Sequence, residues 1–251
     1  MQPPTPLPSE NTMCNECEQP SRRQFLAISA ISIASAVAGP SLFCTPAIAS
    51  GRATSLKPDE ALAKLKEGNA KYVSEPQLCE LELGKRREEV AKGQAPWATI
   101  LTCADSRVPP ELLFGGLNLG ELFVCRNAGN MADTATMGTI EYGAEHLGSP
   151  LIVVMGHERC GAVAAACEVA EKGTDLPGSI GPMVDAILPA ANAMLGKEGD
   201  FVANVVKESA RLTAEKIGSQ SEIVKHLVHE GKVKIVFAVY DLDTGVVEFL
   251  A

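Results

Sequence analysis

The stretches Ala98-Thr99-Ile100-Leu101-Thr102 and Leu151-Ile152-Val153-Val154-Met155 decide the fold of this 251-residue chain. Both are apolar runs of strand length, and residues 121–125 and 233–239 are two further candidates of the same kind. Helical patterns separate the four runs. Because strands alternate with helices, the sequence predicts an α/β fold with a mostly parallel central sheet, right-handed crossovers and helices on its faces.

The segments that flank these runs predict further elements. Asp243-Thr244-Gly245 is a turn that leads into a short antiparallel edge strand over residues 246–250. Before the sheet, a helix is expected over residues 57–73, which open with Pro and two acids, and a second, highly charged helix over residues 80–92. Residues 182–220 are also helical in pattern.

Chemically suggestive side chains follow the two decisive runs. Cys103 comes directly after the first run, and His157 and Cys160 come after the second. The carboxyl ends of parallel strands meet at one edge of a sheet, where α/β proteins place their sites. Two thiols and an imidazole make three soft ligands, which leaves the fourth position of a tetrahedral zinc open, as in catalytic zinc sites. Cys160 is expected at a helix N-terminus, where the pKa of a thiol is lowered.

An acid and a base lie beside the first of these ligands. Asp105 is two residues beyond Cys103, and Arg107 follows at a spacing that allows a bidentate ion pair. The pair predicts an ionised carboxylate that can accept a hydrogen bond from a zinc-bound water or hydroxide. The alternative is that Asp105 caps a helix starting at Pro109-Pro110-Glu111 and forms a local salt bridge with Arg107.

The first fifty residues differ from the rest of the chain. The paired arginines of Ser21-Arg22-Arg23-Gln24-Phe25-Leu26 precede a moderately apolar stretch that ends at a small-x-small site, Ala47-Ile48-Ala49. This arrangement resembles a twin-arginine export signal. We expect removal of residues 1–49, which leaves an N-terminal helical arm of residues 50–95 and an α/β core of residues 96–251.

Cleavage of this leader decides the location of the protein. Left in place, the apolar stretch approaches the length that spans a bilayer and would anchor the chain. Its many Ser and Ala residues make it only weakly hydrophobic, which favours cleavage. We therefore expect an exported, periplasmic protein with no stable membrane anchor.

Composition argues against nucleic-acid binding, and the cysteines and histidines outside the two motifs have simple structural interpretations. Hydrophobic residues make up 46% of the chain and the formal net charge is −9, which argues against a nucleic-acid-binding surface. Cys14 and Cys17 form a C-x-x-C within the leader, without a second pair at zinc-ribbon spacing. Cys125 and Cys167 are expected to be small core residues. Three histidines are expected at the surface or in helix packing: His146, His226 and His229.

Three motifs together resemble the β-class carbonic anhydrases. They are Cys103-Ala104-Asp105-Ser106-Arg107-Val108-Pro109, the segment from Gly120 to Asn130, and Gly156-His157-Glu158-Arg159-Cys160-Gly161-Ala162. The resemblance implies that Cys103, His157 and Cys160 bind one zinc ion per subunit and that Asp105 and Arg107 form the catalytic dyad. It also implies a homodimer or homotetramer, with the N-terminal arm embracing the partner.

The activity implied is the reversible, zinc-dependent hydration of carbon dioxide to bicarbonate and a proton by zinc-bound hydroxide. Two alternatives use the same residues. One is a hydrolase of the sulfur analogues COS or CS₂, and the other is a non-catalytic protein with structural zinc or a bicarbonate site. The Asp105–Arg107 pair argues against the second, because structural zinc has no use for an acid–base pair beside an open position.

Overall fold

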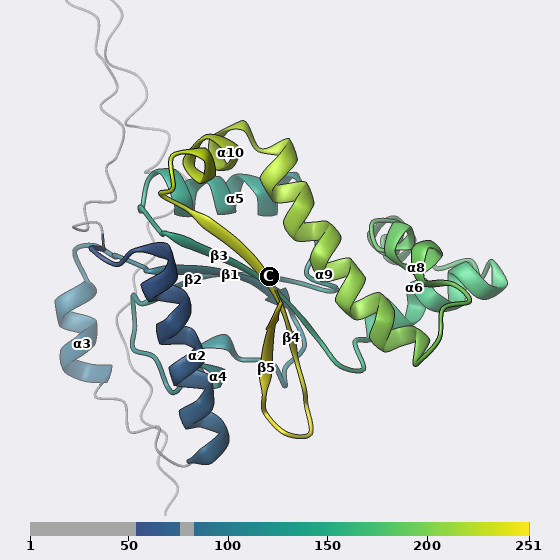
Figure 1. Cartoon of the computed structure of the whole chain (residues 1–251), viewed down its shortest axis with the longest axis horizontal. Coiled ribbons are helices and arrows are strands. Elements are labelled where there is room, and N and C mark those ends of the chain that lie inside the picture. The colour runs from purple at the N-terminus through teal and green to yellow at the C-terminus, as the bar shows by residue number, and fades with distance from the viewer. Residues whose placement is uncertain (1–53, 76–82, 251) are drawn as a thin grey trace, which may run out of the picture. The chain divides into compact units, whose positions relative to one another are not determined.

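A computed structural model describes residues 54–75 and 83–250 (Figure 1). Within them lies a five-stranded sheet with the order β2-β1-β3-β4-β5, parallel except for β5. The strands are β1 (Ala98–Cys103), β2 (Leu122–Asn127), β3 (Leu151–His157), β4 (Lys234–Tyr240) and β5 (Val247–Leu250). The α/β fold with a mostly parallel sheet and an antiparallel edge strand is thus confirmed.

Helices cover both faces of the sheet. Before β1 come α2 (Pro58–Ser74) and α3 (Leu83–Val90), and the short α4 (Pro110–Leu113) and α5 (Thr134–Glu145) flank β2. Between β3 and β4 lie α6 (Gly161–Lys172), α7 (Ile180–Asp185), α8 (Leu188–Met194), α9 (Phe201–Gln220) and α10 (Glu222–His229). None of the helices in residues 54–75 and 83–250 has the length and apolar character that crossing a membrane requires.

The two central strands divide the core because alternate side chains point to opposite faces. Ile100 of β1 and Val153 of β3 pack on α2 and α4, whereas Leu101 and Val154 pack on α5, α9 and α10. Figure 1 shows the two groups of helices on either side of the strands. All six residues of β1 and all seven of β3 are buried, as expected for parallel strands covered on both faces.

Helix α2 begins where its sequence predicts. Pro58 occupies the first turn, and the Glu60 carboxylate accepts a hydrogen bond from the Lys57 N–H at 2.8 Å. The helix buries Ala61 and Leu65 completely against the sheet. Asn69, 5% exposed, fixes its far end by donating to the carbonyls of Leu113 and Gly245. The helix therefore packs on the sheet of its own chain.

Residues 182–220 are largely helical, as their pattern predicts, and belong to α7, α8 and α9. The chain breaks after α7 at Ala186-Ile187 and again between α8 and α9, where Gly196 and Gly199 have positive φ. Asp105 does not cap a helix, since α4 starts at Pro110 with Pro109 as its N-cap residue.

Some expectations lie outside the described residues. These are the leader of residues 1–49 with Cys14 and Cys17, and the start of the helix expected from residue 80, of which the structure describes α3.

Candidate metal centre

The strand order places the first two functional residues side by side. In the sheet, the connection after β1 runs to β2 on one side, whereas the connection after β3 runs to β4 on the other side. A crevice opens at such a switch point, outside the carboxyl ends of the strands. Cys103 ends β1 and His157 ends β3 at this point.

Three side chains converge there. The sulfurs of Cys103 and Cys160 are 3.9 Å apart, and these sulfurs and a His157 ring nitrogen all lie within 4.8 Å of one another. The three residues are 6%, 1% and 0% exposed respectively. The structure thus brings together all three residues that the sequence proposed as metal ligands.

The orientation of His157 frees one nitrogen for a ligand. Its Nδ1 lies 2.8 Å from the carbonyl oxygen of Glu158, so the Nδ1–H donates to that oxygen. The other nitrogen, Nε2, is buried and has no hydrogen-bond partner within the described residues. A backbone carbonyl on Nδ1 is the usual means of presenting the lone pair of Nε2 to a metal.

A tight turn positions the third candidate ligand, Cys160. Arg159 adopts a left-handed conformation with φ 53°, which reverses the chain so that His157 and Cys160 face the same point. The guanidinium of Arg159 donates two hydrogen bonds of 2.8 Å to the carboxylate of Asp243, in the turn between β4 and β5. Cys160 is the N-cap residue of α6, as predicted.

The two thiols influence each other's protonation. The pKa of Cys103 lies well below its usual value, because its thiolate can accept hydrogen bonds from the Cys160 thiol and from the Gly129 N–H. The pKa of Cys160 is raised by the neighbouring Cys103 and by burial. The lowering expected from the helix N-terminus is present, through the N–H groups of Val163 and Ala162, but these two effects outweigh it.

These donors fit zinc. Two sulfurs at a Zn–S distance of about 2.3 Å in a tetrahedron are about 3.8 Å apart, close to the separation of Cys103 and Cys160. Thiolate and imidazole are ligands that zinc favours, and the unpartnered Nε2 of His157 supplies the third donor. Three protein ligands leave one position for water or substrate.

The expected pair of Asp105 and Arg107 is present beside this group. The Arg107 guanidinium donates to both oxygens of Asp105, at 2.9 and 2.7 Å, and the Arg107 backbone N–H donates to Oδ1. These bonds hold the pKa of Asp105 far below its usual range. Oδ2 lies 3.8 Å from Nε2 of His157, so an ionised carboxylate stands at the edge of the donor set.

Two supporting contacts were not predicted from the sequence. Arg126, in β2, donates from Nε to the Cys103 carbonyl at 3.0 Å and from Nη2 to the Asp105 carbonyl at 2.5 Å. Gly129 has φ 84°, and an added Cβ would lie 2.6 Å from the side chain of Ile187. The signal for both was their place at the end of β2 or directly after it, since β2 pairs with β1 residue by residue up to Cys103.

The remaining cysteines and histidines that the structure describes lie where the sequence predicts, in the core and at the surface respectively. Cys125 and Cys167 are buried, and burial raises the pKa of each to about 11. His146, His226 and His229 are exposed.

Comparison with known proteins identifies the family. The family model described as "Carbonic anhydrase" matches residues 98–247. "Carbonic anhydrase 2" of Mycobacterium tuberculosis is 36% identical over 191 residues, which cover 75% of this chain and 90% of the relative. The carbonic anhydrase of Mycolicibacterium smegmatis is 35% identical over 195 residues, covering 76% and 92%.

Solved structures agree with the sequence relatives. The β-carbonic anhydrase CcaA is 25% identical, with a TM-score of 0.60 over 77% of this chain and 93% of that protein. The Coccomyxa β-carbonic anhydrase, solved with acetazolamide, is 29% identical, with a TM-score of 0.59 over 75% and 86%. The chain therefore belongs to the β-class carbonic anhydrases and is an enzyme of that family.

Proposed function

We propose that this enzyme hydrates carbon dioxide reversibly to bicarbonate and a proton, with one zinc ion per subunit held by Cys103, His157 and Cys160. The observation that carries the proposal is the buried, unpartnered Nε2 of His157 beside two thiols, with the Asp105–Arg107 pair 3.8 Å away. Bound there, zinc lowers the pKa of a water and so supplies a nucleophile for carbon dioxide at neutral pH.

The chain's own residues have separate tasks in this reaction. Asp105 stays ionised and accepts a hydrogen bond from the attacking water, which orients the oxygen lone pair toward carbon dioxide. Arg107 keeps that carboxylate charged and fixed by its two side-chain hydrogen bonds. Arg126 holds the backbone of residues 103–105, so that the ligand sulfur and the carboxylate keep their relative positions.

Stopped-flow measurement of carbon dioxide hydration, with zinc quantified in the same samples, tests the proposal. We expect zinc near one per chain and fast hydration in the wild type, and loss of both in Cys160→Ala. Cys125→Ala, which removes a buried thiol outside the donor set, should retain zinc and activity. Zinc-loaded protein that hydrates carbon dioxide no faster than Cys160→Ala would refute the proposal.

The sulfur-analogue alternative is tested in the same preparation. The relatives reported above are named carbonic anhydrases, so hydrolysis of CS₂ gains no support from them. We expect sulfide release from CS₂ to stay at the rate given by Cys160→Ala.

We further propose export with cleavage after Ala49, which leaves Ser50 as the first residue. The support is the paired Arg22-Arg23, the weakly apolar stretch and the small-x-small site. Edman sequencing of protein recovered from the periplasm should begin at Ser50, and protein that keeps residues 1–49 would contradict cleavage.

A homodimer or homotetramer completes the proposal. Structural neighbours include two β-carbonic anhydrases of Sordaria macrospora described as tetrameric, with a TM-score of 0.58 at 22% identity. Sedimentation velocity should give two or four times the monomer mass, and a monomer at micromolar concentration would contradict it.

A further inference from the structure

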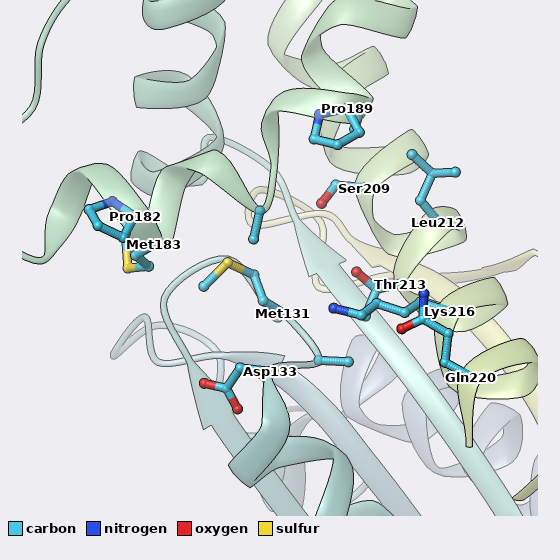
Figure 2. Close-up of a pocket in the computed structure, with 13 residues that line it drawn as sticks. Met131, Asp133, Pro182, Met183, Pro189, Ser209, Leu212, Thr213, Lys216 and Gln220 are labelled. Atoms are coloured by element: carbon cyan, nitrogen blue, oxygen red, sulfur yellow. The ribbon is translucent and has the colours of Figure 1, made fainter. Parts of the chain in front are cut away.

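A cavity separate from the metal centre lies on the face of the sheet covered by α9. Its volume is about 620 Å³, and it lies between the loop that contains Met131, the α7–α8 segment and α9 (Figure 2). This size is typical of sites for small organic ligands, which are mostly apolar with a few convergent polar groups.

One wall of the cavity is apolar. Met131 points into it from the loop after β2, and Pro182, Met183 and Pro189 line it from the α7–α8 segment. Thioether sulfurs contact aromatic rings favourably, and flexible methionines adapt to rings of different size. This wall therefore suits a flat, aromatic body.

The opposite wall is a polar stripe of α9. Ser209, Thr213, Lys216 and Gln220 recur at the spacing that places them on one helix face. Ser209 is 5% exposed and Thr213 is 9% exposed, and both line the cavity. Their hydroxyls are therefore available to a ligand that enters it.

Lys216 is the basic residue of the lining and favours an anionic group near its ammonium. Lys216 forms no ion pair within residues 54–75 and 83–250, and its side chain extends along the cavity. The one acid among the lining residues, Asp133, is the N-cap of α5 and accepts the Thr136 N–H at 2.8 Å. In Figure 2 its carboxylate points away from the cavity.

We propose that this cavity binds an amphipathic aromatic monocarboxylate. The ring lies against the methionines and prolines, and the carboxylate accepts hydrogen bonds from Lys216 and Thr213. Ser209 is seven residues from Lys216, about 10 Å along the helix. Its hydroxyl bonds a polar group at the far end of the ring. This site is independent of the proposed zinc chemistry.

Fluorescence titration of the zinc-loaded protein with 6-hydroxy-2-naphthoate tests the site. We expect saturable binding by the wild type and binding at least about tenfold weaker in Lys216→Gln, because a charge-assisted hydrogen bond is lost. Lys207→Gln is the matched control, since it removes the same charge from the same helix outside the cavity. The neutral probe 6-hydroxy-2-naphthamide should bind wild type and Lys216→Gln equally.

A second pair of variants separates this cavity from the metal centre and from a subunit contact. Ala186 is exposed at the rim, so Ala186→Phe should fill the cavity and abolish binding while zinc content and oligomer mass stay unchanged. Zinc-free Cys160→Ala should still bind the probe. Equal affinity in wild type and Lys216→Gln would overturn the proposal, as would binding that survives in Ala186→Phe and disappears in Cys160→Ala. Absence of wild-type binding, with a lower oligomer mass in Ala186→Phe, would overturn it in favour of a subunit contact.

Discussion

At the scale of the residue, Asp105 and Arg107 are the pair whose roles are most open to test. Neither provides an atom to the cluster of two sulfurs and one imidazole nitrogen. We expect Asp105→Ala and Arg107→Ala to keep zinc but to lose carbon dioxide hydration by on the order of 10²-fold, the usual contribution of a positioned acid–base group. Stopped-flow rates normalised to zinc measure this. Activity lost only in proportion to zinc would reassign the pair to ligand support.

Arg159 makes a prediction about backbone strain. With φ 53° it occupies the left-handed region, which glycine tolerates and β-branched residues do not. Arg159→Gly and Arg159→Val both remove the bonds to Asp243, so the two differ in backbone preference. We expect Arg159→Val to have a free energy of unfolding about 1–2 kcal/mol lower than Arg159→Gly. Urea titration compares them, and equal midpoints would show that the turn relaxes.

The Cys125 thiol should not react with alkylating reagents in the folded protein at pH 8. Burial raises the pKa of its thiol to about 11, which leaves about one thiolate in a thousand at pH 8. Below this pKa the fraction of thiolate, which is the reactive form, grows about tenfold with each pH unit. Iodoacetamide labelling followed by peptide mass spectrometry should find Cys125 unmodified at pH 8 and labelled in urea. Rapid labelling of the native protein at pH 8 would contradict this.

At the scale of the element, one serine joins two helices. Ser221 is 2% exposed, and its hydroxyl accepts the Val224 N–H that caps α10 and donates to Glu141 of α5 at 2.6 Å. We expect Ser221→Ala to lower the free energy of unfolding by about 1–2 kcal/mol. Ser221→Thr keeps the hydroxyl and serves as the control in urea unfolding. A loss of the same size in both variants would mean that packing, not the hydroxyl, matters.

The sequence predicted the strands well because each is an apolar run whose two faces are buried. The structure extends β1 by one residue to Cys103 and β3 by two to His157, since polar ligand side chains interrupt the pattern although the ladder continues. The helical pattern of residues 182–220 did not give the separate ends of α7, α8 and α9, although Gly196 and Gly199 lie at the second break. Ile187, in the first break, packs on Gly129 of a distant loop, a contact that apolar periodicity along the chain does not reveal.

The candidate site was likewise predicted only where neighbouring strand ends bring its residues together, and not where a distant contact supports it. Spacing and residue type sufficed to select Cys103, His157 and Cys160, because two strand ends bring them together. The bond between Arg159 and Asp243 spans 84 residues, and nothing local marks these two as partners. The cavity beside α9 was missed for a similar reason, since Ser209 and Thr213 look like an ordinary polar face until α7 and α8 cover them.

At the scale of the whole molecule, the metal site should contribute to stability. Zinc that binds the folded chain more tightly than the unfolded chain stabilises it by mass action, by about 4 kcal/mol at a thousandfold excess over Kd. We expect a chelator to lower the melting temperature and added zinc to restore it. In Cys160→Ala the melting temperature should not respond to zinc. A chelator without effect on the wild type would show that folding and metal binding are not coupled.

The turn that contains Arg159 is held by Asp243, which lies between β4 and β5 near the end of the chain. This contact has a consequence for the order of events during synthesis. The three proposed metal ligands have all been synthesised once residue 160 has been made, but β3 still lacks its neighbour β4, and Arg159 lacks Asp243. Because a chain emerges from its N-terminus, the ribosome must finish almost the entire polypeptide before this turn can settle. We therefore expect zinc to be acquired after translation and before the export proposed above.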